Sequence, residues 1–364
     1  MRQSRVVQKG GEYTMQKRVA VAMSGGVDSS VTAALLKRKG YDVIGITMRL
    51  WDGEAAEKSA ADAKAVADIL GIPHDTLDFS DTFRRDVVEY FIDAYGRGKT
   101  PNPCVACNRC VKFGRLWDEA RRRGADLLAT GHYARTAYDA ERGVYTLLRG
   151  SDRRKDQSYV LYQLTQDLLP HVLFPMADFE KSDTRAMAQE WGLPVFNKPE
   201  SQDICFIPDN DYKGFLRRER AGMFKAGNFV DADGRVVGRH EGIPAYTIGQ
   251  RRGLNLGGPG GPYYVTALDV ARNQVVVGSN DDLFSSEVRA EGVSWVEGEP
   301  EGRFRALGKI RYAAKESPCT VQLEEHGRIC VTFDQPQRAV TAGQALVLYD
   351  AETGDRVLGG GIIM

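Results

Sequence analysis

The sequence predicts an α/β protein with an N-terminal parallel sheet flanked by helices, followed by two β-rich parts. Strand-like apolar runs alternate with helix-like runs up to about residue 213, and glycine becomes dense beyond it. Such alternation is typical of a parallel sheet with helices on both faces. Short strands recur at regular spacing after about residue 284, as in a small β-barrel. We therefore expect a flexible extension, an α/β domain, a central β-rich domain and a C-terminal β-barrel over residues 1–17, 18–213, 214–283 and 284–364, respectively.

The elements of the α/β domain follow from the spacing of its apolar residues. Continuous apolar runs predict buried strands, whereas apolar residues three and four positions apart predict helices, the first of which ends at Gly40. The expected strands lie at 18–23, 41–51, 74–79 and 125–132, and the expected helices at 29–40, 59–71, 80–98 and 111–124. In the C-terminal half, alternating residues predict short strands within 235–269, 273–279, 305–325, 328–350 and 356–364.

Length and charge set broad limits on the function. The chain has 364 residues, long for one hydrophobic core, and 49 basic residues balance 49 acidic residues. Zero net charge excludes no partner, because a neutral protein binds nucleic acid when basic residues gather on one face. No segment approaches the roughly 18 apolar residues of a membrane helix. The first 17 residues are polar, unlike a signal peptide, and Met15 is a candidate start. We expect a cytoplasmic protein with no membrane partner.

The stretch SGGVDSS at residues 24–30 joins the first expected strand to the first expected helix. A glycine-rich turn in that place points backbone N–H groups and a helix N-terminus at a phosphate. Gly25 and Gly26 allow a tight bend and close approach of a ligand, and the serines can donate hydroxyl hydrogen bonds. The Walker loop carries a lysine for the transferred phosphates, but this loop has Asp28, which suits a magnesium ion beside phosphates.

The stretch resembles the pyrophosphate-binding loop of the PP-loop ATP pyrophosphatases, which cleave ATP between its α and β phosphates. The later motifs TPNPCVACNRCVKF, ATGHYAR, RRKDQSYVLY, ESQDICFIP, YTIGQRRGL and IRYAAKESPC follow in the order of one branch of that superfamily. From about Arg18 to its C-terminus, the chain is similar to the bacterial tRNA-specific 2-thiouridylases. The resemblance implies an adenine nucleotide alpha hydrolase-like, Rossmann-like N-terminal domain.

The same resemblance implies the activity of a tRNA-uridine 2-sulfurtransferase. The C2 oxygen of the wobble uridine of tRNA would be adenylated by ATP and then replaced by sulfur. The products would be 2-thiouridine, AMP and pyrophosphate, and the cofactors would be ATP and Mg²⁺. A sulfur-relay protein or a cysteine desulfurase would supply the sulfur as a persulfide.

Six cysteines are placed unevenly, and three of them cluster at Cys104, Cys107 and Cys110. A disulfide scaffold is not expected in such a chain. Cys319 and Cys330 stand alone in strand-like stretches, as core or sheet residues do. Only a cysteine can carry a transferable sulfur as a persulfide, and a second cysteine is needed if a disulfide resolves it.

The resemblance assigns the persulfide to Cys205 and makes Cys107 its nucleophilic partner, with a transient disulfide between them. The role of Cys104 is open, because some relatives have an aspartate there that can act as an acid or base. Alternatively, Cys104, Cys107 and Cys205 are candidate ligands of a [4Fe–4S] cluster or of zinc, with Cys110 as a fourth candidate.

The resemblance also implies contacts for the remaining motifs. Met48 would contact adenine or ribose, although a methionine there also suits the core, and Gly131 would approach the nucleotide. The ATP loop would comprise Ala22, Met23, Ser24, Gly25, Gly26, Val27, Asp28 and Ser29. The tRNA would contact Asn102, Pro103, Cys104, His132, Lys155, Asp156, Gln157, Arg311, Tyr312 and Gln344. Basic clusters in all three expected domains fit a long RNA held by its phosphates, with the target base flipped into a pocket.

Two other functions are open on the residues alone. Another PP-loop adenylating enzyme, one that delivers ammonia, would need no paired cysteines, and the sequence shows no glutaminase domain. A nucleotide-sensing or RNA-binding module that hydrolyses nothing would fit the β-rich half. That module would leave the phosphate loop and the two distant cysteines unexplained.

Overall fold

The computed structural model describes residues 6–9, 12–15, 17–199, 204–257 and 262–364. The chain forms two compact units, and each is described in turn below. Unit 1 comprises Met1–Arg85 and Cys107–Gln202, and unit 2 comprises Asp86–Ala106 and Asp203–Met364. The segment Asp86–Ala106, which interrupts the α/β part of the sequence, therefore packs with the C-terminal half.

Unit 1 is built on a five-stranded parallel sheet in the order β5–β4–β3–β6–β9. β3 is the first of these strands in the sequence but lies in the centre of the sheet. The chain adds β4 and β5 on one side and β6 and β9 on the other, so the order reverses between β3 and β6. Ligand-binding crevices form at the carboxyl ends of strands at such a reversal. The strands are β3(Arg18–Ala22), β4(Asp42–Arg49), β5(His74–Asp78), β6(Leu127–Ala129) and β9(Val172–Leu173).

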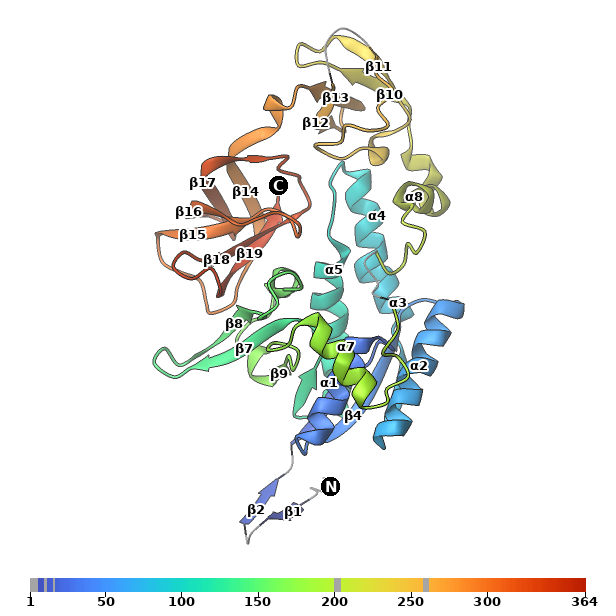
Figure 1. Cartoon of the computed structure of the whole chain (residues 1–364). Coiled ribbons are helices and arrows are strands. Elements are labelled where there is room, and N and C mark those ends of the chain that lie inside the picture. The colour runs from blue at the N-terminus through green and yellow to red at the C-terminus, as the bar shows by residue number, and fades with distance from the viewer. Residues whose placement is uncertain (1–5, 10–11, 16, 200–203, 258–261) are drawn as a thin grey trace. The chain divides into compact units, whose positions relative to one another are not determined.

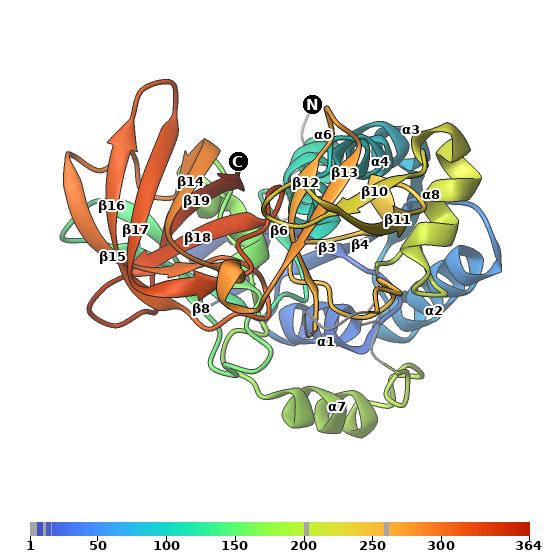
Figure 2. The same ribbon diagram turned by 90° about the horizontal axis from the view of Figure 1, so that it is seen from above.

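Helices cover this sheet because their small and apolar residues face it. Val31, Ala33 and Ala34 of α1 are completely buried in the same cluster as Val19 and Val21 of β3. Figures 1 and 2 show α7 beside α1. The helices are α1(Val27–Arg38), α2(Glu54–Leu70), α3(Ser80–Phe83), α6(Leu116–Arg122) and α7(Lys181–Glu190), with a π-helical segment at Cys107–Arg115 and 3₁₀ turns at Ser158–Leu161 and Leu169–His171. Two antiparallel hairpins complete the unit, namely β1(Val6–Lys9) with β2(Glu12–Met15) and β7(Ala134–Asp139) with β8(Val144–Arg149).

The described residues of unit 2 form three helices, a four-stranded sheet and a closed six-stranded barrel. The helices are α4(Glu89–Gly96), α5(Pro103–Ala106) and α8(Tyr212–Arg220), and short 3₁₀ turns lie at Ala221–Met223, Ile243–Ala245 and Asp281–Leu283. The sheet has the order β11(Val236–His240), β10(Gly227–Val230), β13(Gln274–Gly278) and β12(Tyr264–Asp269). The barrel closes in the order β14(Phe284–Trp295), β17(Arg328–Arg338), β16(Ser317–Glu324), β15(Arg303–Lys309), β18(Ala345–Asp350) and β19(Val357–Ile363) (Figure 1).

The structure confirms the predicted parallel sheet and barrel and refines several boundaries. The helix expected over 80–98 contains a π-helical turn at Arg84–Val88. The helix expected from residue 111 begins earlier, at Pro103, because Asn102 Oδ1 accepts the N–H of Cys104 (3.0 Å). Proline is favoured at the first position of a helix. The hairpin β1–β2 lies within the expected extension. The elements that were not predicted are β7, β8, β9, β10, β14, α7 and α8.

Candidate functional site

The turn between β3 and α1 contains two glycines with different physical requirements. Gly25 has φ +69°, and a Cβ atom there would lie 2.2 Å from the carbonyl oxygen of Ser59 in α2. Packing and backbone conformation both require glycine at position 25. Gly26 has φ −97°, and its added Cβ would meet only Ser24 Oγ, at 3.4 Å. Gly26 therefore leaves space beside the backbone that the described protein does not fill.

The serine side chains fix the shape of this turn. The hydroxyls of Ser29 and Ser30 donate to the carbonyl oxygen of Gly26 (3.2 and 2.8 Å). The backbone N–H of Ser24 donates to Ser29 Oγ (3.2 Å). Ala22, Met23 and Val27 are buried. The predicted ATP loop is thus a hydrogen-bonded turn at the carboxyl end of the central strand.

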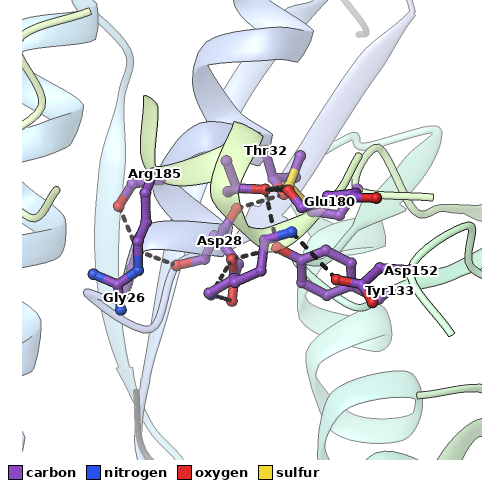
Figure 3. Close-up of polar contacts among 12 residues, drawn as sticks. Gly26, Asp28, Thr32, Tyr133, Asp152, Glu180 and Arg185 are labelled. Atoms are coloured by element: carbon purple, nitrogen blue, oxygen red, sulfur yellow. Dashed lines mark hydrogen bonds and ion pairs between the residues drawn. The ribbon is translucent and has the colours of Figure 1, made fainter. Parts of the chain in front are cut away.

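Asp28, in the first turn of α1, is the centre of a polar network (Figure 3). Lys181 Nζ lies 2.6 Å from both carboxylate oxygens of Asp28. The hydroxyl of Tyr133 donates to Asp28 Oδ1 (3.0 Å) and lies 2.9 Å from the hydroxyl of Thr184 in α7. The side chains of Lys181 and Asp28 are 13% and 31% exposed. The carboxylate is therefore held by groups from two other segments of unit 1.

A second lysine also contacts the turn. Lys198 Nζ donates to the carbonyl oxygen of Gly25 (2.9 Å) and to Asp62 Oδ2 of α2 (2.7 Å). Neither Lys181 nor Lys198 was predicted from the sequence. A local signal existed only for the start of α7, where Glu180 and Asp183 form a capping box, and not for the contact between Lys181 and Asp28.

The segment after β6 packs against the phosphate loop. A Cβ atom on Gly131 would lie 2.8 Å from the backbone nitrogen of Ser29, so only glycine allows this approach. His132 is 7% exposed, and its Nδ1 and Nε2 lie 2.7 Å from Thr130 Oγ1 and 3.4 Å from Lys112 Nζ. Burial, with a smaller effect of the charge on Lys112, lowers the pKa of His132 well below its usual value. The imidazole is therefore neutral at pH 7.

The loop 151–158 lies next to the same network. Gln157 Oε1 accepts the backbone N–H of Tyr133 (3.1 Å), and the N–H of Gln157 donates to the carbonyl of Tyr133 (2.9 Å). Asp156 is 8% exposed and accepts the N–H and hydroxyl of Ser158 (3.1 and 2.8 Å). Lys155 is half-buried. Of the residues predicted to contact tRNA here, Asp156 and His132 are buried, so in this structure they support the surface and do not form it.

Met48 is half-buried near the carboxyl end of β4, one strand from the phosphate loop. The structure thus brings Met48, the turn and Gly131 to the same edge of the sheet in unit 1. This edge is the one at which the strand order reverses.

The clustered cysteines lie at the start of a long helical stretch. Cys107 opens the π-helical segment Cys107–Arg115 of unit 1 and is 8% exposed, while Cys110 is half-buried. The amide of the adjacent Asn108 donates to the carbonyl of Val160 (3.0 Å). π-helical turns are rare and often occur at functional sites. Cys104 is exposed and belongs to unit 2.

Cys205 is exposed on a turn of unit 2 whose neighbours are anchored. Phe206 packs against the rings of Phe91 and Phe215, with centroids 5.4 and 5.3 Å apart. Ile207 is 1% exposed. The apolar residues hold the turn, and the Cys205 side chain remains accessible to solvent.

Three further predicted residues of unit 2 have clear positions. Gln344 Nε2 donates to the carbonyl of Thr100 (2.8 Å), two residues before Asn102, and so holds the segment that leads into α5. Pro103 is buried in the first turn of that helix. Arg311 Nη1 donates to the carbonyl of Arg338 (3.1 Å). The adjacent Tyr312 is 44% exposed.

Cys319 and Cys330 lie in strands β16 and β17 of the barrel, as expected. Burial raises the pKa of the Cys319 thiol to about 12. Within the described ranges, no group of three or more His, Cys, Asp or Glu side chains is arranged to hold a metal ion. In the same ranges, no helix combines the length and apolar character needed to cross a membrane.

Models of three protein families match successive parts of the chain. Residues 17–209 match a tRNA methyl transferase HUP domain, residues 213–279 a tRNA methyl transferase PRC-barrel domain, and residues 285–363 an aminomethyltransferase beta-barrel domain. These matches confirm the predicted order of an α/β domain, a small β-rich domain and a barrel.

Similar proteins are found among tRNA-modifying enzymes. The tRNA-specific 2-thiouridylase MnmA of Carboxydothermus hydrogenoformans is 49% identical over 361 residues, which cover 96% of this chain and 98% of that protein. The tRNA-specific 2-thiouridylase MnmA of Clostridioides difficile is 46% identical over 359 residues, with 96% and 98% covered. A solved structure, the U34-tRNA thiolase NcsA from Methanococcus maripaludis with its [4Fe-4S] cluster, has a TM-score of 0.34 and 20% identity, covering 57% of this chain and 67% of that chain. This last likeness is too low to support an argument about a cluster here.

Proposed function

The chain belongs to the tRNA-specific 2-thiouridylase family, and on this premise we propose how its residues divide the reaction between nucleotide activation and sulfur transfer. The protein uses ATP to replace the C2 oxygen of the wobble uridine of tRNA with sulfur. The observation that carries our assignment of the nucleotide site is the packing of Gly131 against the turn Ser24–Ser29, at the sheet edge where the strand order reverses.

Activation takes place at this turn. The C2 oxygen of uridine attacks the α-phosphorus of ATP, the bond to the β-phosphate oxygen breaks, and pyrophosphate leaves. Backbone N–H groups at the start of α1 face the phosphates, and Gly26 leaves space for their approach. Met48 and Gly131 contact the nucleoside part. Asp28 is the carboxylate that would hold Mg²⁺, which would neutralise phosphate charge.

Sulfur transfer follows activation. Cys205 carries the terminal sulfur of a persulfide, and its exposure suits loading by a sulfur-relay protein or a cysteine desulfurase. The terminal sulfur attacks C2, and the C2–O bond breaks as AMP leaves with the oxygen. The Cys107 thiolate then attacks Sγ of Cys205, which releases the sulfur on C2 and leaves a Cys107–Cys205 disulfide. A thiol reductant restores both cysteines.

The tRNA lies on residues from several segments. The accessible or half-buried candidates in unit 1 are Lys155 and Gln157, and those in unit 2 are Asn102, Cys104, Arg311, Tyr312 and Gln344. Arg311 contributes positive charge near Tyr312. Pro103, His132 and Asp156 are buried and support these contacts from beneath. Such a reaction on cytosolic tRNA fits a cytoplasmic enzyme.

Nucleoside mass spectrometry tests this function directly. Unmodified tRNA is incubated with the protein, ATP, Mg²⁺ and a persulfide donor, and 2-thiouridine is measured after digestion. We expect 2-thiouridine only when ATP and the donor are both present. Turnover of ATP to AMP and pyrophosphate without any thiolated nucleoside would indicate another PP-loop adenylating enzyme.

A cluster-dependent route is the alternative for the sulfur step. In that route Cys104, Cys107 and Cys205 are cluster ligands. Cys104→Asp distinguishes the persulfide route from the cluster route. It introduces the aspartate found in some relatives and removes one candidate cluster ligand. The persulfide route predicts substantial activity in this variant and no correlation between iron content and rate. Loss of activity together with iron, and recovery on cluster reconstitution, would favour the cluster.

A further inference from the structure

The proposed nucleotide site raises a problem of charge. The triphosphate of ATP carries several negative charges, and pyrophosphate gains charge as it leaves, so cations are needed near it. The turn SGGVDSS itself contains an acid and no base. The loop therefore needs a positive group from elsewhere in the fold.

Lys181 is positioned to supply this positive charge. The residue is the first of α7, and its ammonium lies 2.6 Å from both oxygens of Asp28, two residues beyond Gly26. The side chain is 13% exposed, so its charge acts where solvent screening is reduced. A lysine ammonium has three donors and suits phosphate oxygens as a compact charge.

Several contacts fix the position of this lysine. Asp152 is 5% exposed and accepts the backbone N–H of Lys181 (3.4 Å). Burial raises the pKa of Asp152, but hydrogen bonds from the N–H groups of Lys181 and Arg154 outweigh it, so the net pKa is lowered. The hydroxyl of Tyr133 joins Asp28 to Thr184 one turn along α7 (Figure 3). Asp152 and Tyr133 are therefore positioning residues for Lys181.

Lys198 has a different arrangement. Its ammonium is shared between Asp62 and the carbonyl of Gly25. A lysine bonded to a backbone carbonyl and to a carboxylate of α2 fastens the turn to that helix. Of the two lysines, Lys181 is the one whose ammonium forms an ion pair with the side chain of Asp28 in the first turn of α1.

We propose that Lys181 is the residue that binds the pyrophosphate portion of ATP and stabilises the negative charge that develops there as pyrophosphate leaves. This inference rests on the proposed function of the phosphate loop. Lys181 thus does from α7 what the lysine of a Walker loop does from within the loop.

Calorimetric titration tests the inference without relying on turnover. ATP, pyrophosphate and adenosine are titrated with Mg²⁺ present into the full chain and into Lys181→Met, Lys181→Arg and Lys64→Met. Lys64 is the matched control, because it is also paired with an aspartate, Asp68, but lies on the exposed face of α2. We expect Lys181→Met to weaken ATP and pyrophosphate binding about 10- to 100-fold, the loss of one charged hydrogen bond or two. Adenosine binding should stay within about twofold, and Lys64→Met should match the natural chain.

Three results would overturn the inference or its premise separately. Equal ATP affinity in Lys181→Met and the natural chain would exclude Lys181 as a phosphate ligand. Parallel loss of adenosine and ATP binding in both Lys181→Met and Lys181→Arg would show that the ion pair with Asp28 is structural. Absence of ATP binding in the natural chain itself would instead contradict the proposed function of the loop. Retention of ATP binding by Lys181→Arg supports the inference, since the charge is kept.

Discussion

The phosphate loop and the segments that carry the reactive cysteines differ in how their functional side chains are held. Asp28 accepts hydrogen bonds from Lys181 and Tyr133, and the hydroxyls of Ser29 and Ser30 hydrogen-bond within the turn. By contrast, the side chains of Cys104 and Cys205 are exposed. Groups fixed in advance suit the stabilisation of developing charge, whereas a cysteine that is loaded by another protein must be accessible. The comparison indicates that the geometry of activation is built into the fold, whereas loading of the persulfide depends on the accessible Cys205; its partner Cys107 is buried.

The two glycines of the loop give the largest expected effect and sharpen this comparison. Gly26→Val should fold, because position 26 has ordinary φ and room beside Ser24. The added side chain should occupy the space for phosphate and lower adenylation by at least ~100-fold, the scale of a lost transition-state contact. Gly25→Ala should instead lower the free energy of unfolding by about 2–4 kcal/mol, because its Cβ meets Ser59 at φ +69°.

Urea unfolding and ATP–pyrophosphate exchange, measured on both variants, separate these outcomes. A Gly26→Val variant that forms the adenylated intermediate at the normal rate would show that the turn does not bind the nucleotide. Normal stability of Gly25→Ala would contradict the packing of this turn against α2.

Binding of tRNA to the accessible surface should respond to salt. tRNA affinity should fall with ionic strength, because phosphate contacts release counterions. Arg311→Ala should flatten the plot of log affinity against log salt by about one unit, with ATP binding unchanged. Arg305→Ala is a matched control, since Arg305 is paired with Asp334 on the barrel wall. Filter binding over a salt series checks both, and a slope near zero for the natural chain would exclude phosphate contacts.

The melting temperatures of the natural chain and of both variants should be measured alongside the salt series. Arg311 also donates to the backbone carbonyl of Arg338, so its removal can cost stability. An unchanged melting temperature with a flattened slope would assign the effect to tRNA.

The smallest expected effect is that of a substitution at His132. It tests whether His132 is buried with the groups held by the fold or belongs with the accessible residues. Its pKa is lowered by burial in the folded state, whereas an unfolded histidine titrates near pH 6.5. Below that pH the unfolded chain binds a proton that the folded chain does not, so stability falls as pH decreases. His132→Gln should reduce this slope by up to about 1.4 kcal/mol per pH unit below pH 6.5.

Urea unfolding at pH 7.5, 6.5 and 5.5 measures this slope. His326→Gln, at a side chain that is 78% exposed, is the control and should leave it unchanged. His74 and His240 also have lowered pKa values, mainly through burial, and account for a remaining slope. If the free energy of unfolding of His132→Gln depends on pH as that of the natural chain does, His132 belongs with the accessible residues.

The sequence predicted those features that depend on neighbours in the chain. The turn at residues 24–30 and the alternation of strands and helices are local patterns, and the structure has both. Lys181 was not predicted, because it lies 153 positions from Asp28 and no local rule joins them. Likewise, the motif containing Asp156 indicated a tRNA contact, but burial of its side chain depends on the packing of the whole unit.

The central claim is that activation at the loop precedes sulfur transfer and does not need the cysteines. A single-turnover reaction with ATP labelled at the α-phosphate, tRNA and persulfide-loaded protein tests it most directly, with quenched samples examined for adenylated tRNA and mapped for disulfides. We predict that Cys205→Ser accumulates adenylated tRNA and forms no 2-thiouridine, while Cys330→Ser, altered in the barrel strand β17, behaves as the natural chain does. Cys107→Ser should still accept the persulfide on Cys205, and the natural chain should yield a Cys107–Cys205 disulfide that dithiothreitol reduces. Absence of adenylated tRNA in Cys205→Ser, or a disulfide that joins Cys205 to Cys104 or Cys110 instead, would contradict this account.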